Sequence, residues 1–432
     1  MKKDTLIIGF MLFALFFGAG NLIYPPTLGI EAGTSFWPAI IGFILTGVGL
    51  PVVAVAAVSF VSNDARELAD HVHPLFGLIF TTVVYLAIGP FFGIPRASTV
   101  AFEMTVEPFT AGTSGLLFIF TTIFFIAVLL VSMNPSKLVD RIGQWLTPIL
   151  LLALIVICIG GFLLLDQTAA GPPSADYATA PFFNGFAEGY LTMDAIAALA
   201  FGIIVVNAFK DRGISTRKGL MKATLKTGSV AGIALAVVYT SIGWIGTRMG
   251  DAGDFTNGGD ILSSAAEGIF GSFGALILGL IVALACFSTS VGLVVACGQF
   301  FNKLTGISYR WIISVITIGS YVIANQGLNT IVGVSVPVLT FIYPIAIVLI
   351  ILTFLHKFFG GYRTVYRGAI LLTAIAALYD GLNEFGVNMP EIAAIMEKLP
   401  FSSIGLGWLF PAIIGGLIGY IFKNKTKASH AR

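Results

Sequence analysis

A Gly-Ala-Gly-Asn stretch at residues 18–21 interrupts the first apolar segment of the chain, and two prolines follow it at 25–26. Glycine permits backbone conformations that a helix interior does not hold. Inside a bilayer, the N–H and C=O groups of an unwound stretch need other partners. The half-helix that begins near Asn21–Ile23 would favour a carboxylate, whereas the carbonyls that end the preceding one, around Ala14–Phe17, would suit a cation. Close helix packing through small residues is the alternative, but the asparagine and the prolines favour unwinding.

Asp194 is an acidic residue within the sixth apolar segment, directly after Thr192-Met193. A carboxylate at the centre of a membrane costs ~2.5–3.5 kcal/mol on insertion scales, so such groups usually face a cavity and have a function. Asp194 could pair with the ammonium group of a substrate, help to hold a cation, or take up a proton. Alternatively, Thr192 or Asp194 caps a helix that restarts at Ala195, and the two roles are compatible.

Three consecutive hydroxyl residues, Ser288-Thr289-Ser290, lie in the eighth apolar segment. Hydroxyl oxygens are hard ligands of the kind that a small cation such as sodium prefers. Hydroxyls in membrane helices also commonly bond back to the preceding helical turn. The hydroxyls alone leave both interpretations open, and an unwound first segment beside them makes the cation site more plausible.

Arg96 is a basic residue inside the third apolar segment, which also contains Pro90, Pro95 and Glu103. Arg96 and Glu103 share one helix face but lie ~10 Å apart along the helix axis, so a direct ion pair between them is not expected. Arg96 could line the outer vestibule and take part in gating, or it could tie its helix to backbone carbonyls of a neighbour. The residue types leave both roles open.

The elements that position these residues are membrane-spanning helices. Of the 432 residues, 57% are hydrophobic and 10% are charged, whereas soluble domains are nearer one quarter charged. A bilayer accommodates that much apolar surface, and a single globular core does not. The net charge of +2 gives no indication of a nucleic-acid partner. We predict twelve spans, at about residues 5–30, 37–61, 74–107, 115–132, 143–165, 182–209, 226–248, 271–301, 308–325, 328–354, 365–382 and 405–422.

The distribution of basic residues predicts the orientation of these spans. With the N-terminus inside, all 23 Lys and Arg residues except Arg96, Arg248 and Lys398 lie on the inner side, as the positive-inside rule requires. An even number of spans then places both termini in the cytoplasm. The longest outer loops, about 249–270 and 383–404, contain apolar turns that could form short helices over the outer face.

The first and sixth spans share an anomaly, because each is interrupted after a similar number of residues. Five spans separate their starts, so the two run in opposite directions. Interrupted segments at matching places in two halves of a chain indicate an inverted-repeat transporter.

Other classes of protein fit the sequence less well. It contains no Walker loop and no HExxH, CxxC or GxSxG motif, so we do not expect an enzyme. The four histidines lie in polar segments or at span ends, which argues against haem between helices, and no tightly bound cofactor is expected. A channel needs a continuous polar pore, whereas the polar groups here cluster at a few points. A membrane subunit of a larger complex such as a respiratory pump would carry chains of buried ionisable residues, and mainly Asp194 and Arg96 are present.

The segment at residues 9–26, GFMLFALFFGAGNLIYPP, resembles the branched-chain amino acid carrier family, the LIV-II or BrnQ carriers of bacteria. The resemblance extends over essentially the whole chain and includes Pro95-Arg96, the 192–194 stretch and the 288–290 hydroxyls. It implies import of leucine, isoleucine and valine across the bacterial inner membrane, driven by a cation gradient. It also implies membership of the amino acid/polyamine/organocation clan, with the five-plus-five inverted repeat of the bacterial leucine symporter.

Site residues follow from this resemblance. It places the substrate carboxylate on the backbone of Ala19, Gly20 and Asn21. It places sodium on the carbonyls of Ala14 and Phe17 and on the hydroxyls of Thr289 and Ser290.

The resemblance leaves alternatives open at two places. Neighbouring helical side chains point about 100° apart, so Thr289 and Ser290 could border one groove facing the first span, with Ser288 farther round. The leucine symporter has no carboxylate that matches Asp194, which leaves open whether Asp194 meets the substrate amine, replaces an ion ligand or takes a proton.

We therefore expect an all-α polytopic membrane protein that forms one transmembrane domain over residues 1–432. Its repeats would cover about 5–166 and 182–355, with peripheral helices at about 365–422. It would carry branched-chain amino acids together with sodium or, as the alternative, a proton. The substrate site would include Thr192 and Asp194, and the sequence does not indicate an oligomeric state.

Overall fold

The computed structural model describes residues 2–61, 65–110, 115–134, 147–165, 170–250, 253, 255 and 257–423. Five of the basic residues used to predict the orientation lie outside the described residues, namely Lys137, Arg141, Lys425, Lys427 and Arg432. The predicted end of the first repeat, at 166, lies outside them too. The described part of the chain is helical and contains no strand, which confirms the all-α prediction.

The helices of the first half are α1 (Lys2–Phe16), α2 (Ala19–Ala32), η1 (Gly33–Ser35), α3 (Phe36–Ile44), η2 (Leu45–Gly49), α4 (Leu50–Val61), α5 (Ala65–Asp70), α6 (Pro74–Leu86), η3 (Ala87–Phe91), α7 (Gly93–Thr105), η4 (Glu107–Phe109), α8 (Leu116–Ser132) and α10 (Thr147–Leu164). Those of the second half are α11 (Ala175–Thr179), α12 (Pro181–Glu188), η7 (Gly189–Thr192), α13 (Asp194–Lys210), α14 (Arg217–Thr247), α15 (Gly258–Phe270), α16 (Ser272–Thr305), α17 (Tyr309–Ala324), α18 (Leu328–Leu355), α19 (Arg363–Glu384), α20 (Pro390–Met396), η8 (Ser402–Ile404) and α21 (Leu409–Ile421).

The long helices are apolar enough to cross a membrane. By length and composition, the described residues contain 7 such helices, or up to 8 if the bent pair Pro181–Thr192 and Asp194–Lys210 forms one span. Shorter apolar helices lie at Asp4–Phe16, Leu116–Ser132, Tyr309–Ala324 and Leu409–Ile421. Large apolar side chains cover the outside, where Leu163 is 75% exposed and Trp311 is 71% exposed, as lipid-facing surfaces require. The structure is that of a multi-pass membrane protein, and the number twelve stays a prediction.

The two predicted interruptions are present, and each falls in an apolar segment. Phe17 and Gly18 separate α1 from α2. The sixth segment bends by 45° between η7 and α13. Short helices also occupy the two long loops, as α15 and α20, which confirms the helices, and their place over the outer face stays a prediction.

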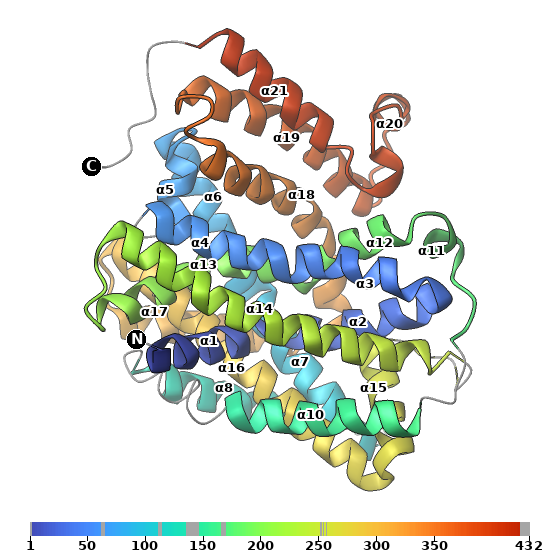
Figure 1. The fold of residues 1–432 in the computed structure, drawn as a ribbon. Helices are drawn as coiled ribbons and strands as arrows, with labels where there is room; N and C mark the ends of the chain where they lie inside the picture. The colour runs from blue at the N-terminus through green and yellow to red at the C-terminus, as the bar shows by residue number, and fades with distance from the viewer. Residues whose placement is uncertain are drawn as a thin grey trace.

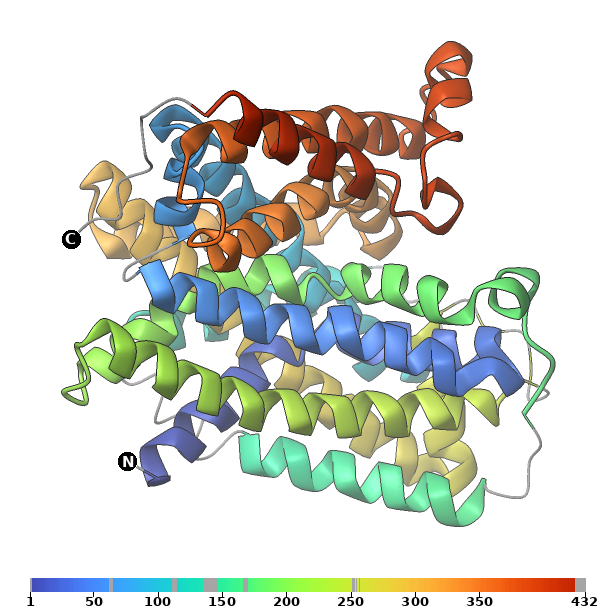
Figure 2. The ribbon, with the colours of Figure 1, turned by 45° about the horizontal axis from the view of Figure 1, so that its top comes forward.

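Figure 1 shows how the broken segments lie in the bundle. α14 runs alongside α1 and α2, and α4 runs alongside α13. α7 packs against α16. α19 and α21 pack together at one side of the molecule, next to α18, and α10 lies at the opposite side in both views (Figure 1, Figure 2). The long helix α14 therefore lies beside the broken first segment, and α19 and α21 lie at one side of the bundle.

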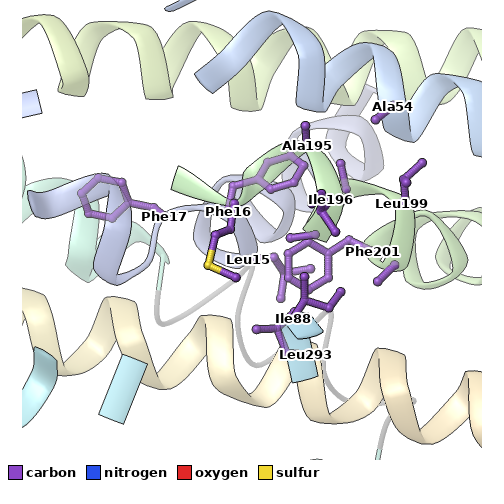
Figure 3. Packing of buried hydrophobic residues seen from close by; sticks show 14 of the residues in the cluster. Leu15, Phe16, Phe17, Ala54, Ile88, Ala195, Ile196, Leu199, Phe201 and Leu293 are labelled. Carbon is purple, nitrogen blue, oxygen red and sulfur yellow. The ribbon is translucent and has the colours of Figure 1, made fainter. Parts of the chain in front are cut away.

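The core beside the first break is packed from side chains of several segments (Figure 3). Phe16 of α1 meets Phe201 of α13 with ring centroids 5.7 Å apart, and Ile88 and Leu293 lie close by. In a membrane such contacts stabilise by van der Waals packing, because lipid tails are as apolar as the side chains. This packing fixes the rotation of α1 and α13 about their axes and so positions the polar groups at their broken ends.

A kink in the third segment brings Arg96 to the centre of the bundle. At η3 the helix widens into π-type turns, with Gly89 at φ −85° and ψ −116° and Pro90 beside it. Proline removes a backbone hydrogen bond and crowds the preceding turn, which is a common origin of helix kinks. α7 restarts at Gly93 in a new direction, and Arg96 projects from its first turn.

Candidate functional site

The break in the first segment is closed by the side chain of Asn21. Gly18 has an extended backbone, at φ −128° and ψ −157°. Its N–H donates to Asn21 Oδ1 at 2.9 Å instead of to the carbonyl of Ala14, four residues earlier. Ala14 O is therefore released from the helix ladder. A single glycine-to-asparagine bond thus produces both a free carbonyl on α1 and a new helix N-terminus on α2.

The carbonyls at the end of α1 and in the break face the hydroxyls of α16. Ser288 Oγ donates to Ala14 O at 2.8 Å. Thr289 Oγ1 lies 3.4 Å from Ala14 O and 3.3 Å from Phe17 O. These contacts bring together three of the four predicted cation ligands, Ala14, Phe17 and Thr289.

The predicted placement of Ser288 is wrong. Ser288, expected to project away from α1, contacts it directly. Ser290 Oγ is buried and has no hydrogen-bond partner among the described residues. The reason is the rotation of α16 about its axis, which packing against α7, α8 and α13 determines and which the 100° spacing of neighbouring side chains leaves undetermined. The role of all these groups as sodium ligands stays a prediction.

The break in the sixth segment has a backbone that is unusual for a residue other than glycine. Met193 lies in the left-handed region, at φ 67° and ψ 3°. A residue with a side chain adopts this conformation at a cost of order 1–3 kcal/mol and only where its surroundings enforce it. The turn is supported by Thr192, whose hydroxyl donates to Gly189 O at 2.9 Å and accepts from the N–H of Asp194 at 3.4 Å.

Asp194 joins three segments of the bundle through its side chain. Asn21 Nδ2 and the hydroxyl of Tyr239, on α14, both donate to Asp194 Oδ2, the second at 3.1 Å, and Asn21 also donates to Tyr239. The three side chains are at most 3% exposed. The N-cap residue of α13 is Met193, and its side chain accepts no hydrogen bond from the first N–H groups of the helix. The interpretation of the Asp194 carboxylate as a helix cap is therefore wrong, because this carboxylate reaches across to α2 and α14.

Arg96 connects the third segment to the bend of the sixth. Its Nη1 donates to Leu191 O at 3.4 Å and contacts Met193 Sδ at the same distance. Its guanidinium carbon lies 5.2 Å from the centre of the Tyr24 ring, within the range of a cation–π contact. Of the two roles suggested by the sequence, these contacts show the tie to a neighbour's carbonyl, and gating stays a prediction.

A small cavity of about 40 Å³ lies between the two breaks. Its polar lining comes from Gly18–Asn21, Arg96, Thr192–Asp194 and Thr289. Its apolar lining is formed by Leu15, Phe16, Ile88, Ala97, Ala197 and Leu293. Because small-molecule sites usually measure ~300–1,000 Å³, the surrounding helices must separate before a solute of amino acid size can enter.

Sequence reasoning missed two residues of this centre, Tyr239 and Tyr343. Tyr239 binds Asp194, as described above, and Tyr343 Oη accepts from the N–H of Ala195 at 3.3 Å. Both rings are buried. A buried tyrosine hydroxyl usually finds a polar partner, so a tyrosine inside an apolar span is a weak signal of a polar neighbour.

The whole chain matches known proteins. The model of a family described as branched-chain amino acid transport protein matches residues 1–426. The branched-chain amino acid permease BrnQ of Bacillus subtilis (strain 168) is 47% identical over 430 residues, which is 98% of each chain. The permease BraB of the same organism is 44% identical over 424 residues, covering 97% of this chain and 95% of BraB. The relatives are permeases, which are transporters and not enzymes.

Solved structures with the same fold have far less similar sequences. A Na⁺-coupled sialic acid symporter, in a substrate-bound outward-open state, has a TM-score of 0.63 at 14% identity over 98% of this chain and 91% of its own. Mhp1, a nucleobase-cation-symport-1 family transporter, has a TM-score of 0.59 at 14% identity over 96% and 91%. These structures show a shared transporter fold, which confirms the predicted fold class. The resemblance carried by residues 9–26 is also confirmed, and the chain belongs to the branched-chain amino acid transport protein family.

Proposed function

We propose that this protein is a secondary symporter that imports leucine, isoleucine and valine across a bacterial inner membrane, with sodium as the coupling ion and both termini in the cytoplasm. The observation that carries the proposal is the meeting of two broken helices at one cavity. The names of the relatives support the substrate class. The alternative coupling ion is a proton carried by Asp194.

The substrate carboxylate would bind at the start of α2. The first N–H groups of a helix have no partner within it, and together they act as about half a positive charge. Ala19, Gly20 and Asn21 line the cavity with this end of α2. Arg96 adds a full positive charge on the same cavity wall. The amine of the substrate would then lie toward Asp194, whose carboxylate lines the same cavity.

We predict that one site accepts all three branched-chain amino acids. They differ by a methylene or a branch point, worth only ~1–3 kcal/mol in an apolar pocket, and the side-chain part of this cavity is apolar. Inhibition constants measured against labelled leucine should therefore agree within roughly a hundredfold. Lysine and glutamate should not compete, because their side-chain charges would lose water without a partner. Strong competition by either would contradict the apolar pocket.

Sodium would bind between α1 and α16. It needs several oxygens at short range. Three contacts already join such oxygens: Ser288 Oγ lies 2.8 Å from Ala14 O, and Thr289 Oγ1 lies 3.4 Å from Ala14 O and 3.3 Å from Phe17 O. Because these ligands are neutral, bound sodium would add its positive charge beside the break in the first segment. Binding would hold α1 against α16 and favour the conformation that accepts substrate, so the coupling would be a shift in populations.

We predict that Thr289→Val raises the sodium concentration for half-maximal leucine uptake at least tenfold, or about 1.4 kcal/mol. The change keeps the side-chain shape and removes the oxygen that contacts both carbonyls of α1. Uptake of labelled leucine into proteoliposomes at varied sodium measures the effect. Thr373→Val is the matched control, since that buried hydroxyl bonds only within α19, to Ala369 O at 2.7 Å. An unchanged sodium dependence in Thr289→Val would mean that sodium binds at another site.

The proposal as a whole is tested by imposing sodium and proton gradients separately on proteoliposomes. A potential of 100 mV supplies ~2.3 kcal/mol per charge, enough for roughly fiftyfold accumulation with one ion. Sodium-driven, saturable uptake with counterflow is expected. Non-saturable flux would indicate a channel, and accumulation driven only by the proton gradient would indicate the alternative ion.

A further inference from the structure

A second cavity, of about 400 Å³, lies on the other side of the bend in the sixth segment. Its walls come from the end of α2, from α11, from the second half of α12 and η7, from the middle of α18, and from the end of α19 and the loop before α21. Five carboxylates line it: Glu31, Asp176, Glu188, Asp380 and Glu384. No lysine, arginine or histidine is among its lining residues. The lining therefore offers only acidic and uncharged groups, and an anionic ligand would meet no counter-charge.

One end of the wall holds two buried polar groups with a second carboxylate beside them. The Tyr177 hydroxyl and Glu188 Oε2 are buried, and the two side chains interact with each other. Tyr177 is only 2% exposed. Glu188 also lies close enough to Glu31 for their charges to repel. Neighbouring carboxylates disfavour each other's charged form, and a cation between them removes that penalty, so this end of the wall favours a ligand that supplies positive charge.

The rest of the wall indicates an organic cation. Tyr190 and Tyr343 lie with ring centroids 5.2 Å apart, and Trp408 and Leu339 add apolar surface. Aromatic faces attract ammonium groups, quaternary ones above all. The described residues contain no group of three His, Cys, Asp or Glu side chains placed to hold a metal ion. The volume and the aromatic wall suit a ligand with an apolar body.

The backbone of the bend separates this cavity from the central one. Tyr190 and Leu191 line the larger cavity, whereas the next three residues, Thr192–Asp194, line the central cavity. Arg96 holds this partition by its bond to Leu191 O, and Tyr343 holds it by its bond to Ala195. The two cavities share no lining residue, so each can have its own ligand.

We propose that the larger cavity is a binding site for organic ammonium ions that have an apolar body and no carboxylate, distinct from the central site. With the predicted orientation it opens toward the outside, and an occupant would obstruct the route of the substrate. The binding itself does not depend on the proposed transport function.

The probe is phenyltrimethylammonium, a permanent cation that does not dissipate proton gradients. Its binding to the purified full-length protein in detergent is measured by scintillation proximity with labelled probe. Glu188→Gln keeps the shape of the side chain and should weaken binding at least tenfold. Glu384→Gln, at an exposed position of the wall, should weaken probe binding severalfold. It replaces Glu188→Gln as the test if that variant does not fold. Glu267→Gln is the matched control, because this exposed acid of α15 lies outside the lining, and its affinity should stay within twofold of the wild type.

Leucine binding, measured on the same samples, separates this proposal from the function proposed above. Probe binding without leucine binding would refute the transport assignment and leave the ammonium site standing. The ammonium site is overturned if the probe does not bind, if both cavity variants bind it like the wild type, or if leucine displaces it and Asp194→Asn abolishes its binding. The last outcome would place the probe in the central cavity.

Discussion

Gly20→Val should abolish leucine binding while leaving a folded protein in the membrane. A β-carbon at position 20 would lie 2.8 Å from Arg96 Nη2 and 3.2 Å from both Cα and O of Thr192. The arginine can move, but the Thr192 backbone belongs to the bend of the sixth segment and cannot yield without shifting Met193 and Asp194. The valine side chain would also cover the N–H groups at the start of α2. We expect at least a hundredfold loss of affinity, about 2.8 kcal/mol.

Scintillation proximity with labelled leucine measures this loss, and gel filtration of the purified protein reports folding. Gly333→Val is the matched control, because a β-carbon at that position of α18 would meet no atom within 4 Å, and its affinity should be that of the wild type. If Gly20→Val does not fold, Gly20→Ala serves as the test. It adds only the β-carbon and should lower the affinity for leucine at least tenfold. Wild-type affinity in a well-folded Gly20→Val protein would mean that this glycine serves helix packing alone.

The positions of the breaks could be predicted because they depend on local chemistry. Glycine and asparagine in one apolar segment, and a carboxylate in another, are groups that an uninterrupted membrane helix does not favour. The same physics operates in the structure, where Asn21 caps the turn at Gly18 and Met193 adopts a left-handed backbone. No longer-range information was needed for these features.

The partners of Asp194 could not be predicted, because they depend on tertiary packing. Asn21 is 173 residues away in the chain and Tyr239 is 45 residues away. A tyrosine inside an apolar span has the same local pattern whether its hydroxyl meets a carboxylate or a carbonyl. The expectation that Ser288 projects away from α1 failed for a related reason, since the rotation of α16 is determined by its neighbours on several sides.

Asp194→Asn should separate the two possible coupling ions, and its effect should be large. The carboxylate is buried and accepts hydrogen bonds from Asn21 and Tyr239, and it forms no ion pair with Lys or Arg in the described part of the chain. Asparagine has the same shape and can present its carbonyl oxygen to both donors, so the fold should survive. If Asp194 is a permanently charged partner of the substrate ammonium, leucine binding should weaken about tenfold or more at every pH, because a charge-assisted bond becomes a neutral one of roughly half its strength.

A proton-carrying Asp194 would give a different result from the same variant. Asparagine imitates the protonated acid, so leucine exchange between equal pools should persist, whereas accumulation driven by an acid outside should be lost. The measurements are leucine binding from pH 5 to 9, exchange, and accumulation under separate sodium and proton gradients, all in proteoliposomes or purified protein. Tyr239→Phe is the companion variant, because it removes one donor to Asp194 Oδ2 and keeps the charge, and it should weaken binding less than Asp194→Asn does. Normal binding and normal uptake under both gradients in Asp194→Asn would reduce this carboxylate to a structural link between α2, α13 and α14.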